Sequence, residues 1–96
     1  MTNTGSPRDG TDPTVHEINE SVSVLTKFSG GRMDPLRFRW NNRVFDVARV
    51  NGKWEEREGQ FKLHYFAVVT KENDYYELVY NTRTMGWTLV RTDFDA

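Results

Sequence analysis

The chain contains no cysteine among its 96 residues, which excludes disulfide bonds and thiolate metal sites. It also lacks a long apolar run, since no segment approaches the ~20 residues that a membrane-spanning helix requires. The first residues are polar and hold no apolar segment typical of a signal peptide, so we expect a cytoplasmic protein without membrane attachment. No segment keeps a sustained 3.6-residue apolar period, and we therefore expect little helix.

Charge is nearly balanced over the whole chain but unevenly distributed along it. The net charge is −1, which argues against wholesale binding of nucleic acid. The window from Lys27 to Lys53 holds seven cations and two anions, which gives +5, so the remainder carries −6. This excess either marks a surface for an anionic partner or supplies the charged outer residues that a half-exposed sheet needs.

The strongest structural signal is a predicted hairpin around Asn41-Asn42. Leu36, Phe38 and Trp40 alternate with Arg37 and Arg39 before this pair, and a basic β-run begins after it. Asparagine tolerates the positive φ angles of a two-residue hairpin turn, so alternation on both sides of the pair predicts two antiparallel strands.

The rest of the chain repeats this pattern of short alternating runs and turns. It predicts an all-β domain over residues 20–96, an antiparallel meander of five or six strands that forms a curled sheet or a small barrel. Residues 1–19 are expected to form a flexible N-terminal tail, disordered or loosely docked. The apolar positions change phase within the third run, which predicts either a β-bulge near Ala48-Arg49 or a turn at Asn51-Gly52. The expected strands are 21–28, 36–40, 43–57, 61–70, 75–80 and 87–91.

Catalytic and metal-binding chemistry finds no support in the sequence. The two histidines, His16 and His64, lie far apart, whereas a zinc site needs three or four closely spaced ligands. Ser29 beside two glycines has neither a neighbouring base nor the strand–turn–helix setting of a nucleophile. We therefore expect a non-enzymatic protein with no catalytic residues, no metal and no cofactor.

Two groups of residues are candidates for binding. The basic residues of the second and third runs would contact nucleic acid or another anionic partner from one strand face; they are Arg37, Arg39, Arg43 and Arg49. Most aromatic residues share parity with aliphatic neighbours and are expected in the core. The exceptions, for which we expect a place on the surface, are Trp54, Tyr65 and Tyr75.

From Asp34 to Val90 the chain resembles a small bacterial all-β domain family of unknown function. The motifs that carry the resemblance are Phe38-Arg39-Trp40, a tight turn, a basic run from Arg43 to Trp54, Tyr65-Phe66-Ala67-Val68, Tyr76-Glu77-Leu78 and Trp87-Thr88-Leu89. Some relatives are associated with mutagenic DNA repair in actinobacteria, so the resemblance implies a nucleic-acid role and no catalytic residues.

Two functions remain open at this point. The first is a small binding module whose basic face contacts nucleic acid or another anionic partner. The second is a protein-interaction module that uses a sheet edge or exposed aromatic residues such as Trp54.

Overall fold

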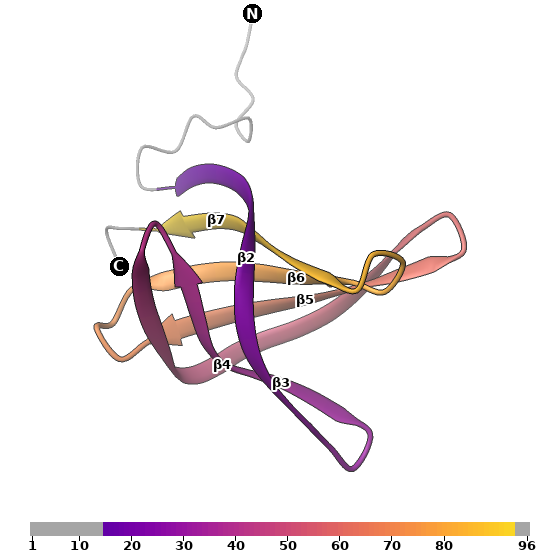
Figure 1. Ribbon diagram of the computed structural model, residues 1–96, viewed down its shortest axis with the longest axis horizontal. Helices are drawn as coiled ribbons and strands as arrows, with labels where there is room; N and C mark the ends of the chain where they lie inside the picture. Colours follow the sequence, from indigo (N-terminus) through magenta and orange to yellow (C-terminus); the bar gives the residue numbers. More distant parts are fainter. Residues whose placement is uncertain (1–14, 94–96) are drawn as a thin grey trace, which may run out of the picture.

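The computed structural model describes residues 15–93, which form a six-stranded antiparallel β-barrel (Figure 1). Consecutive strands pair as a meander, and β2 also pairs with β7 to close the barrel. The predicted all-β meander is confirmed, and of its two expected forms, a curled sheet or a small barrel, the structure has the barrel. Among the described residues, no helix is long and apolar enough to cross a membrane. The strands are β2 (Val15–Ser29), β3 (Arg32–Trp40), β4 (Arg43–Glu58), β5 (Phe61–Thr70), β6 (Tyr75–Asn81) and β7 (Gly86–Asp93).

The barrel begins earlier than the predicted domain boundary. Val15, His16 and Glu17 pair with the end of β7, so the last residues assigned to the tail belong to a strand. The signal missed in the sequence is weak because β2 is irregular here: its register with β7 shifts between Glu17 and Glu20, and Asn19 has a φ of 55°. The rest of the predicted tail, residues 1–14, lies outside the described residues.

The predicted hairpin at Asn41-Asn42 is confirmed. Both asparagines have positive φ angles, 54° and 61°, and Trp40 pairs directly with Arg43 across the turn. These angles match the two-residue turn whose twist suits flanking antiparallel strands. A second turn of the same kind joins β2 to β3 at Gly30-Gly31, where φ is 56° and 76°.

Strand β4 is bent by irregular pairing, which decides between the two alternatives for its change of phase. Its register with β5 shifts between Val47 and Arg49, and again between Val50 and Gly52. The predicted β-bulge at Ala48-Arg49 is therefore confirmed, and the strand continues through Asn51-Gly52 without turning. Both Val47 and Val50 consequently pack against the core from one strand. Bulges strengthen local twist, which helps a sheet to curl into a small barrel.

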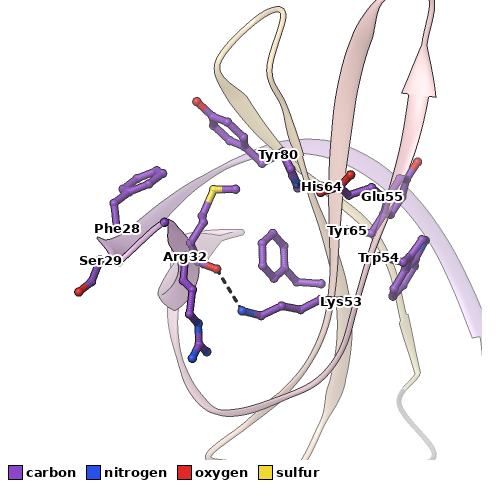
Figure 2. A pocket seen from close by; sticks show the side chains of 13 residues that line it. Phe28, Ser29, Arg32, Lys53, Trp54, Glu55, His64, Tyr65 and Tyr80 are labelled. Atoms are coloured by element: carbon purple, nitrogen blue, oxygen red, sulfur yellow. Dashed lines mark hydrogen bonds and ion pairs between the residues drawn. The ribbon is translucent and has the colours of Figure 1, made fainter.

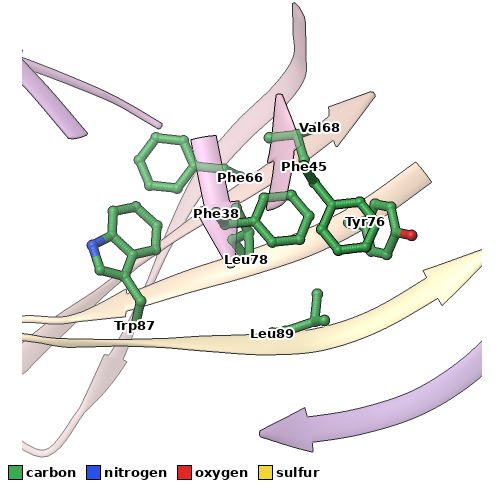
Figure 3. Close-up of a cluster of buried hydrophobic side chains, with 8 residues drawn as sticks. All are labelled: Phe38, Phe45, Phe66, Val68, Tyr76, Leu78, Trp87 and Leu89. Atoms are coloured by element: carbon green, nitrogen blue, oxygen red, sulfur yellow. The ribbon is translucent and has the colours of Figure 1, made fainter. Parts of the chain in front are cut away.

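Aromatic side chains fill the barrel interior (Figure 3). The rings of Phe38 and Phe45 stack with centroids 4.9 Å apart, and Tyr76 meets Phe38 edge-on at 5.2 Å. Such pairs stabilise a core beyond their burial of apolar area, by about 0.5–1.5 kcal/mol each. Trp40 is only half-buried against this cluster, and its indole Nε1 donates a hydrogen bond to Glu20 Oε1 at 2.8 Å. The buried members of the cluster are Phe38, Phe45, Phe66, Val68, Tyr76, Leu78, Trp87 and Leu89.

Candidate binding surfaces

The four candidate arginines do not lie together on one basic face of the barrel. Arg37 and Arg39 share the outer face of β3, as their alternation with Phe38 predicts. Arg37 lies opposite Asp46, and its Nε is 2.6 Å from Asp46 Oδ1. The Arg37 guanidinium thereby lowers the pKa of the Asp46 carboxyl. Asp46 largely neutralises the charge of Arg37, so Arg39 is the less constrained cation of the two.

The other two arginines lie elsewhere. Arg43 shares parity with Phe45, and its guanidinium lies 4.8 Å from the centroid of that ring, on the side of the core. Arg49 lies at the β4 bulge, where its Nε donates to Asn51 Oδ1 at 3.2 Å. Asn51 Nδ2 in turn donates to the hydroxyl of Tyr75 at 3.4 Å, so Arg49 is linked to β6 and not to the Arg37–Asp46 pair.

The predicted surface aromatics all lie on the outer face of β4, β5 and β6. Trp54 pairs with Tyr65 across the two strands, and the rings stack with centroids 5.2 Å apart and planes at 10°. Trp54 remains 38% exposed, and Tyr75 is similarly exposed on β6. Burial raises the pKa of Tyr65, and the neighbouring Glu56 carboxylate raises it further. The alternation with buried Phe66 was the sequence signal that indicated this outward position of Tyr65.

Strand β4 has a long edge without a partner among residues 15–93. Its pairing with β3 covers Arg43 to Asp46, whereas its pairing with β5 runs on to Glu58. The beginning of β3, residues 32–35, likewise pairs only with β2. The β3–β4 seam of the barrel is therefore split, and the two hairpins that flank it extend away from each other (Figure 1). An unpaired strand edge presents backbone N–H and C=O groups to any extended chain that approaches it.

A cleft of about 760 Å³ lies between these two hairpins (Figure 2). Lys53 crosses it: its Nζ donates to Asp34 Oδ1 at 2.8 Å and to the Met33 carbonyl at 3.4 Å. The same ammonium lies 5.8 Å from the centroid of the Phe66 ring. Trp54 and Tyr65 point to the other side of their strands, away from Lys53 (Figure 2). The cleft is lined by Phe28–Met33, Lys53–Glu55, His64–Phe66 and Tyr80.

The polar groups in and beside the cleft form ion pairs with one another. Asp34 also lies 3.5 Å from Arg32, and the hydrogen bond from Lys53 is the main cause of the lowered pKa of its carboxyl. His64 Nδ1 lies 3.5 Å from Glu55 Oε2. Within residues 15–93 no group of three or more His, Asp or Glu side chains is placed to hold a metal ion. Sequence reasoning missed this cleft, because it depends on how far the β3–β4 pairing extends.

Comparisons of the chain with protein-family models, with curated proteins and with solved structures find no match. The resemblance to a bacterial family therefore remains a prediction from the motifs.

Proposed function

We propose that this chain is a non-enzymatic protein-interaction module that adds an extended segment of a partner to the free edge of β4. The observation that carries the proposal is the end of the β3–β4 pairing at Asp46, after which β4 continues to Glu58 with β5 as its one neighbour among the described strands. Main-chain hydrogen bonds along such an edge provide affinity, and alternating side chains provide specificity.

The surroundings of this edge support strand addition. The cleft beside it offers space on the inner face, where side chains of an added strand would approach Phe66 and Met33. On the outer face, the exposed indole of Trp54 supplies a large apolar contact. Aromatic residues at the centre of an interface commonly contribute most of its binding energy.

Hydrogen exchange on the isotopically labelled protein tests the proposal. Backbone amides of Lys53–Glu58 alternate between the β5 side and the free edge, so those at the free edge should exchange rapidly in the free protein. Extended peptides selected from a random display library should slow exchange at these alternate amides. Selected peptides that bind without protecting any of them would refute the proposal.

Binding of nucleic acid through the basic residues has less support from the geometry. Arg37 is paired with Asp46 and Arg43 lies against Phe45, so the outer face of β3 offers two arginines at most. Two phosphate contacts to a single strand would give a log–log salt slope of about −1.4. A titration with single- and double-stranded oligonucleotides at 50 and 200 mM salt tests this alternative. A slope near −3, abolished by Arg37→Glu with Arg39→Glu, would favour nucleic acid over a protein segment.

A further inference from the structure

The outer side of the free β4 edge carries a defined row of three side chains. Trp54, Glu56 and Glu58 alternate along the strand and therefore share the face that Trp54 shares with Tyr65. Tyr65 covers one face of the indole from the β5 side. The opposite face of the indole consequently lies toward the unpaired edge, where an added strand would place its own side chains.

The two carboxylates of this row are not neutralised by the described part of the chain. Neither Glu56 nor Glu58 forms an ion pair with another described residue, although Glu56 interacts with the Tyr65 hydroxyl. On the inner face of the same edge, Lys53 is paired with Asp34, and Glu55 with Lys62 and His64. Arg57 also lies on the inner face and forms no ion pair with a described residue, but its charge is positive and its guanidinium donates to the Gln60 carbonyl. The negative charge that has no ion pair therefore lies on the outer face, next to the exposed indole.

We propose that the segment that occupies this edge is basic: an extended strand with arginine or lysine at alternate positions, facing Trp54, Glu56 and Glu58. The inference rests on the proposed function, since it specifies the partner of the same edge. Side chains directly opposite each other on antiparallel strands have Cβ atoms about 4.5–5.5 Å apart, so cations at these positions meet the carboxylates. A guanidinium opposite Trp54 stacks on the open face of the indole.

The positions between the cations face the cleft and favour apolar side chains. An added strand alternates like its neighbour, so every second residue points to the inner face, on the side of Phe66. Lys53 and Asp34 already form an ion pair there, so neither of these two groups needs a charged residue of the partner. The partner pattern is therefore a cation followed by an apolar residue, repeated.

Three synthetic peptides test the inference on the full chain. The first alternates arginine with valine, the second alternates glutamate with valine, and the third repeats the first with a central proline, which cannot complete strand pairing. We expect the arginine peptide to bind, to protect the free-edge amides of β4, and to lose affinity as salt rises. The glutamate and proline peptides should bind at least tenfold more weakly, because one meets like charge and the other cannot pair.

Matched protein variants locate the contact. Glu56→Lys should weaken the arginine peptide by roughly tenfold and strengthen the glutamate peptide, because it reverses the charge of a cross-strand pair. Glu72→Lys makes the same change on the exposed β5–β6 turn and should alter neither affinity. Trp54→Leu keeps an apolar side chain but removes the indole, and should cost about threefold for arginine.

The outcomes separate this inference from the function on which it rests. If arginine and glutamate peptides bind equally and both protect the β4 amides, strand addition stands and the basic partner is refuted. If Glu72→Lys weakens binding as much as Glu56→Lys, the effect is one of net charge and the inference also fails. If neither these peptides nor library-selected ones protect β4, both proposals fail.

Discussion

Replacing Gly52 by alanine should stabilise the barrel, although glycine follows a bulge at this position. Gly52 lies opposite Ala67 on the outer face, and its φ is not in the left-handed region. A Cβ built on it would lie 3.9 Å from the Ala67 Cβ and 4.0 Å from Trp54 Cζ3, which are ordinary van der Waals distances. The added methyl group would therefore fill space between two existing side chains without displacing either.

The expected gain follows from the unfolded chain. Alanine has fewer accessible backbone conformations than glycine, and at a compatible site this stabilises a protein by about 0.4–1 kcal/mol. In a domain of this size 1 kcal/mol raises the melting temperature by roughly 4–8 °C. We expect Gly52→Ala to raise the melting temperature by about 2–8 °C.

Thermal unfolding followed by circular dichroism measures the change, with Gly59→Ala as the matched control. Gly59 has a φ of 63°, and no atom beyond its two chain neighbours lies within 4 Å of a Cβ built on it, so alanine there gains no tertiary contact and adopts an unfavourable conformation. That variant should lose about 1 kcal/mol. A melting temperature for Gly52→Ala at or below that of the unmodified protein would refute the reasoning, because the space beside Trp54 and Ala67 would not accept a methyl group.

Two further changes test the core and the split seam. Phe45→Ala should cost about 3–5 kcal/mol in the free energy of unfolding, measured by denaturant titration, because it removes a buried ring stacked on Phe38. A loss below about 1 kcal/mol would mean that Phe45 is not a core residue. Lys53→Met should raise the pKa of Asp34, read by carboxyl-carbon NMR, toward its ordinary value of 3.8, and by more than Arg32→Met does. Since Asp34 titrates lower in the folded protein, its contribution is present above pH 3.8 and is lost as pH falls through the folded pKa. Lys53→Met should therefore weaken the fall in stability at low pH. An unchanged Asp34 pKa would contradict the ion pair between Lys53 and Asp34 across the split seam.

Local alternation was enough to predict most of the strands and their turns. Asn41-Asn42 accepts positive φ, so the hairpin between β3 and β4 is encoded within a few residues. The parity of Phe38 and Phe45 likewise indicated that both belong to the core. The same rule gave Arg37 and Arg39 an outward position, because a strand has only two faces.

At the bulge of Ala48-Arg49, local alternation no longer predicts a single structure. A change of phase is visible in the sequence, but its two explanations, a bulge or a turn, place the following residues differently. The face of Arg43 depended in the same way on the register of the turn before it. Pairing with a neighbouring strand settles both points, and no local pattern records that pairing.

The sequence by itself determined that this protein is an all-β meander with an aromatic core. Only the tertiary structure decided where the pairing of β3 and β4 stops, and hence that β4 keeps a free edge beside a cleft. It also decided that Arg37 forms an ion pair with Asp46, while Glu56 forms none within residues 15–93. The physical reason is that the formation of a strand depends on residues adjacent in the chain. Free edges, clefts and charges without an ion pair depend instead on which distant residues the twist and curvature of the sheet bring together or keep apart.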